Sequence, residues 1–378
     1  MLISSLLRRI SPVWGFVLGA VSLVAADVSY RRDWQTDVPW SVQIARLDLG
    51  DSRYTVYAPL ARGTVAGLAT LSEMARQVPP AIGKARAGVN GDFYQREGSP
   101  YTGDPRGLQI VNGELASGPG RAGSVWMDAA GRPHAAEVTG KFSVTWADGS
   151  QTPFGLNEAR TPGMAVLYTG LMGRTTATRG GRELILERDG VGPWVPLAIG
   201  ETYRARVREV REQGNTALTR ESLVLSLGIG VKAVVAAGDT ITLSTATAPD
   251  LKGAVAAIGG GAVLVRDGKS LEIPKPAGAG GYEVASQFQR HPRSAVGWNE
   301  KELYLVQVDG RQPGLSIGMT LAELGEYMRT KLACTEVISL DGGGSATFRY
   351  DGRVRNSPCD GNERPIANSL LIIEKNKP

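Results

Sequence analysis

Apolar and polar residues alternate along much of the chain in short runs that glycines interrupt, and this pattern predicts strands joined by tight turns. Residues 40–57 alternate in this way around Gly50-Asp51, which predicts a hairpin. Between residues 107 and 269, further short β-prone runs occur. These runs predict strands at residues 108–111, 124–127, 142–146, 183–187 and 240–243.

Two segments instead predict helices that are followed by a buried strand. Residues 70–73 and 320–323 each have the capping-box pattern Thr-x-x-Glu. Each predicted helix leads into an apolar run and then into a polar loop, which begins with Asn90 in one case and Asp341 in the other. The similar spacing predicts an internal pseudo-repeat, with both loops at neighbouring parallel strand ends in one cleft. A chance similarity of two capped helices is the alternative.

Composition narrows the fold class. The chain has 378 residues, of which 42% are hydrophobic, 21% are charged and 49 are glycine. This apolar content excludes a disordered chain, and the glycines lack the three-residue period of collagen. No Ser/Pro-rich linker divides the chain. We therefore expect an α+β fold in a single large domain, residues 40–375, with a mixed, strand-rich twisted sheet and a few packed helices, after a lead-in at residues 27–39.

The N-terminus has the pattern of a secretory signal peptide. Arg8 and Arg9 precede an apolar run that ends in Val24-Ala25-Ala26. Residues 1–26 are therefore interpreted as a cleaved signal, with an uncleaved anchor helix as the alternative, and the mature protein as periplasmic or extracellular. No membrane association is expected beyond this segment. Without it the net charge falls from +5 to +3, and the scattered basic residues indicate no nucleic-acid partner.

The chain has two cysteines, Cys334 and Cys359. In an exported protein an even pair favours one disulfide, so we expect these two residues to be joined. Two independent buried thiols are the alternative.

Several motif matches lead to no function. Residues 118–123 match a dinucleotide fingerprint but no capped helix follows, and residues 314–318 match a nucleophile elbow but no histidine follows His291. With His134 as the other histidine, a His-rich zinc site is excluded. The glycine run 259–261 has no adjacent acid and is interpreted as a turn.

The polar loop that begins with Asp341 is a candidate anion site, and it follows the apolar run after the second predicted helix. Asp341 lies at the end of that run, and Gly342, Gly343, Gly344 and Ser345 follow it. Consecutive glycines leave backbone N–H groups uncovered, and a serine adds a hydroxyl donor, so this loop predicts binding of an anion. A plain tight turn is the alternative.

Three further polar clusters are each ambiguous on their own. The segment Asn90-Gly91-Asp92 also fits a type I′ turn. Residues 290–293 also fit a solvated basic turn, and Asp309-Gly310-Arg311 also fits an ordinary hairpin. Together with the glycine loop they occur in the order expected of the phosphodiester glycosidase family, which the chain resembles from about residue 40 to residue 373. The segments that carry the resemblance are 88–94, 291–297, 308–311, 318–324, 340–346 and 362–368.

The resemblance implies an exported hydrolase that cleaves a sugar-1-phosphate diester on the sugar side. Its substrate would be a phosphorylated glycan of the cell envelope or an exopolysaccharide. Asp92 and Asp341 would be the acid/base and nucleophile pair, in an order left open, with Asn90 and Asp309 beside them. The expected phosphate- and substrate-binding residues are Arg293, Arg364, Arg311, His291, Gly342, Gly343, Gly344 and Ser345.

Two other function classes remain open. The first is a metal-dependent phosphodiesterase in which Asp92, Asp309 and Asp341 hold Ca²⁺ or Mg²⁺; otherwise no cofactor is expected. The second is a glycan-binding envelope protein without catalytic activity.

Overall fold

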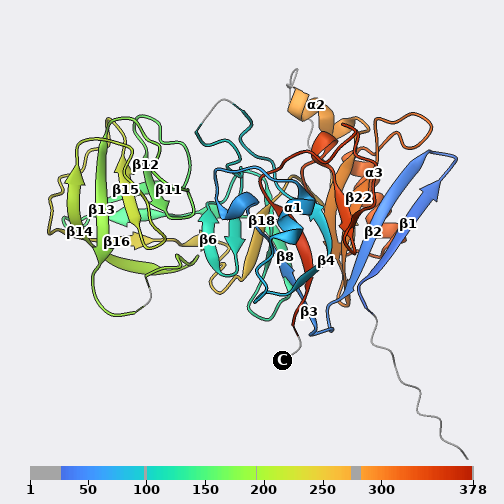
Figure 1. Ribbon diagram of the computed structural model, residues 1–378, viewed down its shortest axis with the longest axis horizontal. Helices are drawn as coiled ribbons and strands as arrows, with labels where there is room; N and C mark the ends of the chain where they lie inside the picture. Colours follow the sequence, from blue (N-terminus) through green and yellow to red (C-terminus); the bar gives the residue numbers. More distant parts are fainter. Residues whose placement is uncertain (1–26, 98–99, 193, 274–281, 377–378) are drawn as a thin grey trace, which may run out of the picture.

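The computed structural model describes residues 27–97, 100–192, 194–273 and 282–376, and strands dominate this part of the chain. Figure 1 shows a β-barrel formed by the middle of the chain beside a group of stacked sheets formed by the two ends. The strand-rich fold is therefore confirmed. The single twisted sheet is wrong, because the strands form three larger sheets and a closed barrel, and helices contribute little. Residues 1–26, the proposed signal, lie outside the described residues.

The largest sheet has seven strands, all antiparallel. In spatial order they are β1 (Ser29–Gln35), β2 (Trp40–Asp48), β22 (Glu302–Val308), β21 (Arg293–Trp298), β23 (Glu336–Ser339), β19 (Val263–Arg266) and β20 (Lys269–Ser270). Helix α3 (Leu321–Lys331) packs against β19 and β23 through its buried face. The region expected to be a lead-in thus contains an edge strand, β1.

Two five-stranded sheets complete the stacked part. One consists of β25 (Arg353–Val354), β24 (Phe348–Tyr350), β4 (Lys84–Asn90), β26 (Ser369–Glu374) and β3 (Tyr54–Tyr57), with α1 (Leu71–Arg76) packed on β4. The other consists of β6 (Glu114–Ser117), β5 (Gln109–Val111), β18 (Ala256–Gly259), β7 (Gly123–Met127) and β8 (Pro133–Glu137). All three sheets contribute to one core, which includes Val89, Ile258, Leu305, Ile338 and Phe348.

The barrel forms from one continuous stretch of chain. Its strands, in order around the barrel, are β10 (Ser143–Thr145), β11 (Gln151–Leu156), β12 (Ala165–Thr169), β15 (Leu223–Leu227), β13 (Arg182–Arg188), β14 (Thr202–Arg211) and β16 (Thr240–Ser244). The chain enters and leaves it through the paired strands β9 (Thr139–Gly140) and β17 (Thr247–Ala248). The remaining elements are η1 (Ala61–Gly63), α2 (Tyr282–Phe288) and η2 (Gly343–Ser345).

Local expectations hold better than long-range ones. Each of the five β-prone runs in the middle of the chain contains a strand, and both helices start with the predicted capping box, at Thr70 and Thr320. The hairpin at residues 40–57 is wrong, because β2 and β3 belong to different sheets. The parallel neighbours expected in the pseudo-repeat are also wrong, since β4 and β23 lie in separate sheets.

The two cysteines are free thiols, so the expected disulfide is wrong. Cys334 is 1% exposed in the core at the end of α3. Cys359 lies beside Asp360, at the other end of β23. The four residues of β23 span about 13 Å, which exceeds the Cα separation of about 7 Å that a disulfide allows. The alternative of two independent thiols is what the structure shows.

Candidate active site

The candidate site forms where the ends of β4 and β23 meet. Asn90, the last residue of β4, is fully buried, and its Nδ2 donates a hydrogen bond to the Asp341 carbonyl at 2.6 Å. Its Oδ1 accepts a hydrogen bond from Ser294 Oγ at 2.5 Å. The Asp341 N–H donates to the Gly91 carbonyl at 2.9 Å. Asn90 therefore joins the two loops and fixes the Asp341 backbone, and both of its amide atoms are used in doing so.

The Asp92 carboxyl is enclosed by backbone that lacks side chains. It is 3% exposed, and a Cβ added to Gly259 would lie 2.3 Å from Asp92 Oδ2. Oδ1 accepts from the Phe93 N–H at 2.7 Å, whereas no hydrogen bond of ordinary geometry from the described residues reaches Oδ2. Burial raises the pKa of Asp92 to about 8, and the Asp341 charge adds to this, against the opposing Phe93 and Gly107 N–H groups.

The Asp341 carboxyl differs from Asp92 in its surroundings. Burial raises its pKa to about 6, and the nearby Ser345 hydroxyl, the Gly342 N–H and the charge of Arg364 limit the rise. Gly342 N–H donates to Asp341 Oδ1 at 2.8 Å. At neutral pH, Asp92 therefore keeps its proton while Asp341 is mostly ionised. Two neighbouring carboxyls with separated pKa values are the usual arrangement of an acid and a base.

Two guanidinium groups lie against the glycine loop. A Cβ added to Gly344 would lie 1.9 Å from Arg364 Nη2, and one added to Gly343 would lie 3.2 Å from Arg311 Nη2. Gly343 also has a φ of +59°, which favours glycine. The loop thus allows both cations to approach closely because it has no side chains there.

Three of the loop's backbone donors are already used within the protein. The N–H groups of Gly342, Gly343 and Ser345 donate to Asp341 Oδ1, the Pro292 carbonyl and the Gly342 carbonyl. The Ser345 bond belongs to the tight 3₁₀ turn η2, whereas the other two join the loop to Asp341 and to the Pro292 segment. In contrast, Ser345 Oγ is buried and makes no hydrogen bond of ordinary geometry with the described residues. It lies near the Asp341 carboxyl, whose pKa it lowers, and is a candidate donor to that carboxyl or to a ligand.

The Arg293 guanidinium is bonded to backbone carbonyls of other segments. The side chain is 8% exposed, and its Nε donates to the Met319 carbonyl at 2.8 Å. Its Nη2 donates to the carbonyls of Ser286 and Gln289 at 2.6 and 2.8 Å. These contacts disagree with the expected phosphate clamp, because the guanidinium holds the end of α2 and the Met319 segment in place.

Asp309 also has a structural environment. It is 1% exposed, and its carboxylate accepts hydrogen bonds from Ser41 Oγ at 2.8 Å, the Ser357 N–H at 2.9 Å and Gln307 Nε2 at 3.2 Å. A catalytic role for Asp309, or a shared metal site with Asp92 and Asp341, is therefore not supported by the geometry. The described ranges contain no group of three or more His, Cys, Asp or Glu side chains arranged to hold a metal ion.

His291 lies beside one of the two cations. Arg311 Nε donates to His291 Nδ1 at 3.2 Å. Burial lowers the pKa of His291, and the charges of Arg311 and Arg293 lower it further. The imidazole is therefore neutral at neutral pH, and Nδ1 is its acceptor atom.

The structure adds residues that sequence reasoning missed. Arg96, just beyond the Asn90 loop, contributes a positive charge that lowers the pKa of Asp341. Asp360 Oδ2 accepts hydrogen bonds from Arg364 Nε at 3.0 Å and from Nη2 at 2.5 Å. The glycine run 259–261 is not a plain turn, since Gly259 packs against Asp92. Because residues 360–364 form no helix, the four-residue spacing of Asp360 and Arg364 gave no signal that these residues pair.

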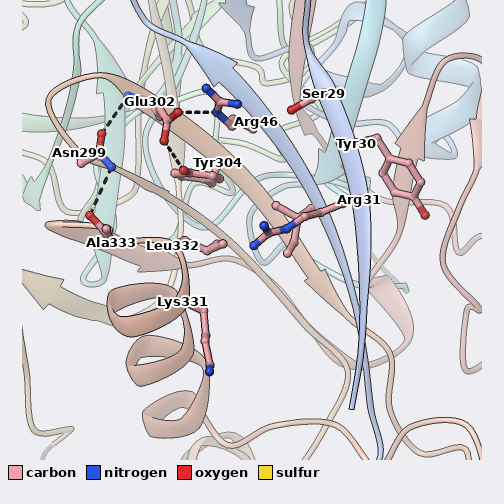
Figure 2. Close-up of a pocket in the computed structure, with 11 residues that line it drawn as sticks. Ser29, Tyr30, Arg31, Arg46, Asn299, Glu302, Tyr304, Lys331, Leu332 and Ala333 are labelled. Carbon is pink, nitrogen blue, oxygen red and sulfur yellow. Dashed lines mark hydrogen bonds and ion pairs between the residues drawn. The ribbon is translucent and has the colours of Figure 1, made fainter. Parts of the chain in front are cut away.

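A separate cavity of about 450 Å³ opens at the other end of β23. Figure 2 shows hydrogen bonds among some of its lining residues: Glu302 pairs with Arg46 and Tyr304, and Asn299 Nδ2 donates to the Ala333 carbonyl at 3.3 Å. None of the residues expected at the active site lines it. The cavity is thus distinct from the candidate site.

Residues 202–373 match the family described as NAGPA, phosphodiester glycosidase. The family resemblance is confirmed. The matched stretch includes Asp341, the glycine loop, Arg311 and Arg364, whereas Asn90 and Asp92 precede it. In the described part of the chain, no helix is both long and apolar enough to cross a membrane.

Two curated proteins resemble the chain over shorter stretches. The SPbeta prophage-derived uncharacterized protein YomE of Bacillus subtilis is 33% identical over 84 residues, which cover 22% of this chain and 13% of that protein. The N-acetylglucosamine-1-phosphodiester alpha-N-acetylglucosaminidase of Bos taurus is 32% identical over 113 residues, 29% of this chain and 20% of that protein. The similarity thus spans well under two thirds of either relative, at the level of the phosphodiester glycosidase family.

Two solved structures share the fold over most of the chain. A hypothetical protein from Synechocystis has a TM-score of 0.71 at 17% sequence identity. The matched region covers 91% of this chain and 61% of the Synechocystis chain. A protein of Burkholderia pseudomallei K96243, described as exported, has a TM-score of 0.68 at 22% identity, with coverages of 89% and 74%. At these identities the two structures show a common fold.

Proposed function

We propose that this protein hydrolyses a sugar-1-phosphate diester on the sugar side, as a phosphodiester glycosidase. The observation that carries the proposal is the arrangement of Asp92 and Asp341 beside a glycine loop against which Arg311 and Arg364 lie. The two arginines suit the binding of an anion, and the two carboxyl groups suit acid–base chemistry. The match to the family supports the same reaction class.

The guanidinium groups of Arg311 and Arg364 would bind the phosphate. When the bond between C1 of the sugar and the bridging oxygen breaks, the electron pair remains on that oxygen, and negative charge increases on the phosphate. Fixed cations stabilise this charge more as it develops than in the bound substrate, which lowers the barrier. The buried Ser345 hydroxyl would donate to the same group.

The two carboxyls would act at C1. The ionised Asp341 would either attack C1 directly or remove a proton from the attacking water, so that the water oxygen ends in the free sugar. Asp92 keeps a proton at neutral pH and would serve as the acid. Because a phosphate leaving group is a weak base, we expect Asp92 to contribute less to the rate than Asp341 does.

Hydrolysis in ¹⁸O-water tests the proposal directly. A panel of glycosyl-1-phosphate diesters is incubated with the protein, and the products are analysed by mass spectrometry. We expect the label in the sugar and none in the phosphomonoester. Label in the phosphate would show attack on phosphorus, as in a phosphodiesterase, and would contradict the proposal. Cleavage of none of the diesters would contradict it as well.

The substrate and location are proposed on the sequence alone. The signal-like residues 1–26 support export to the periplasm or beyond, where phosphorylated envelope or exopolysaccharide glycans are found. The mass of the mature protein, isolated from the cell envelope and the medium, tests this. A chain that retains residues 1–26 would contradict cleavage.

A further inference from the structure

A third charged group, Asp360, lies among the two cations of the candidate phosphate site. Its Oδ2 accepts from Arg364 Nε at 3.0 Å and from Nη2 at 2.5 Å. A Cβ added to Gly344 would lie 2.2 Å from this oxygen and 1.9 Å from Arg364 Nη2, so the ion pair lies directly on the glycine loop. Arg311, which lies against Gly343, also acts on Asp360 electrostatically. The carboxylate is therefore part of the surface that a phosphate would contact.

Asp360 carries its negative charge at neutral pH. Partial burial opposes ionisation, but the hydrogen bonds and charge of Arg364, with Arg311, hold the pKa of Asp360 below its ordinary value. The carboxylate side chain is 41% exposed and that of Arg364 is 27% exposed, so both face the solvent from which a ligand arrives. With Arg311, Arg364 and Arg96 as cations, and Asp360 and the ionised Asp341 as anions, the net charge around the glycine loop is about +1.

That net charge matches one class of phosphate better than another. A phosphodiester carries a single negative charge, whereas a phosphomonoester carries about −1.5 to −2 near pH 7. The second charge of a monoester is repelled by a carboxylate that already occupies part of the guanidinium donors. In the proposed reaction, the diester is the substrate and the monoester is the product.

We propose that Asp360 determines specificity at this site, by favouring the monoanionic phosphodiester over the dianionic phosphomonoester. This rests on the proposed function for its biological meaning, since weak binding of the monoester would release the product. The anion preference itself concerns only the charged groups at the glycine loop and does not depend on which reaction the protein catalyses.

Binding of two small probes to Asp360→Asn tests the inference. Dissociation constants for dimethyl phosphate and methyl phosphate are measured by ³¹P NMR titration at pH 7.5, on the full chain. We expect the wild-type protein to bind dimethyl phosphate more tightly than methyl phosphate. In Asp360→Asn the ratio of the two constants should shift roughly 10-fold toward methyl phosphate, because one charge repulsion at close range is removed. Asp360→Glu should keep the wild-type ratio.

Asp128→Asn is the matched control. Asp128 forms the same four-residue ion pair, with Arg132 Nε at 3.0 Å, in the connection between β7 and β8. Its replacement should leave both constants unchanged. An unchanged ratio in Asp360→Asn would overturn the inference, and so would an equal loss of both probes, which would mean that Asp360 only holds Arg364. Failure of the wild-type protein to bind either probe would also overturn it.

The design separates this inference from the proposed function, because neither probe is a glycoside and neither needs to be hydrolysed. Sugar-side cleavage with an unchanged ratio would retain the function and reject the role of Asp360. A shifted ratio without cleavage of any glycosyl diester would retain the anion preference and reject the function.

Discussion

At the scale of single residues, two carboxyl groups of the same type differ because their surroundings differ. Asp92 is enclosed between Gly107 and Gly259 next to the Asp341 charge, whereas Asp341 lies near the positive charges of Arg364 and Arg96. Burial raises both pKa values, to about 8 and about 6, and the positive charges near Asp341 favour the lower value. These pKa values favour Asp92 as the acid and Asp341 as the nucleophile or base, an assignment that the sequence leaves open.

The pH dependence of kcat/KM follows from these values. Asp341 must be ionised, so activity should rise as pH increases through about 6. Asp92 acts as the acid only while protonated, so activity should show a smaller decrease above about pH 8. Asp92→Asn should remove the alkaline fall, since an amide does not titrate there. Initial rates at subsaturating substrate from pH 4.5 to 9.5 measure the profile. An alkaline fall that persists in Asp92→Asn would contradict the assignment.

Removing the charge of Asp341 should stop turnover without unfolding the protein. Asp341→Asn keeps the size of the side chain and the Asp341 N–H bond to Gly91, but it lacks the nucleophile or base. We expect kcat to fall by roughly 10²-fold or more, with little change in the melting temperature. Kinetics and thermal unfolding of the same preparation provide the measurement, with Asp128→Asn as the control for loss of one carboxylate. Turnover close to that of the wild-type protein would exclude Asp341 as the reactive group.

Gly259 is expected to be intolerant of a side chain. The Cβ of Gly259→Ala would meet Asp92 Oδ2 at 2.3 Å, which displaces the carboxyl or the strand. Activity should therefore fall by roughly 10-fold or more, as for other small misplacements of catalytic groups. Gly140→Ala is the control, because its nearest neighbour, Pro119 Cδ, would lie at 3.4 Å, an ordinary contact. Equal activity of both variants would show that the space beside Asp92 does not matter.

At the scale of elements, the site depends on how strand ends are held. The β4 and β23 loops join through Asn90, and Arg293 at the start of β21 anchors α2 and the Met319 segment. Arg311 and Arg364 reach the glycine loop from two other segments of the chain. The arginines that the sequence groups together as phosphate ligands therefore have different roles, because their side chains contact different neighbours.

Arg293→Lys should act through stability more than through phosphate binding. Lysine keeps the charge but loses the planar fork that reaches three carbonyls, so we expect a loss of about 2 kcal/mol in unfolding free energy. Any loss of activity should be similar for a phosphodiester substrate and for an aryl glycoside without phosphate. Denaturant unfolding and kinetics on both substrates measure this. A selective loss on the phosphodiester would restore Arg293 as a phosphate ligand.

At the scale of the whole molecule, three sheets share one core, and the barrel is attached through β9 and β17. The site lies at one end of β23, and the cavity in Figure 2 lies at the other. The same strand separates Cys334 from Cys359. The stability of the fold therefore comes from apolar burial and not from a cross-link between these two residues.

The thiols provide a test of this arrangement. We expect two free thiols per chain after denaturation without reductant, because Cys334 and Cys359 are unpaired. Reductant should leave the melting temperature of the native protein unchanged. Thiol titration with and without reductant measures this. Fewer than two thiols before reduction would indicate a disulfide and contradict the structure.

The sequence by itself determined the local features of this protein. Alternation of apolar residues located the strands of the middle region, and Thr70 and Thr320 located two helix starts, because such signals depend on neighbours in the sequence. The ordered motifs also indicated the family, and with it Asp92 and Asp341 as candidates. Only the tertiary structure decided which sheets the strands join and which cations face the loop. Asn90 meets Asp341 across 251 residues of chain, and such long-range contacts, with the burial that shifts the carboxyl pKa values, exist only in the folded molecule.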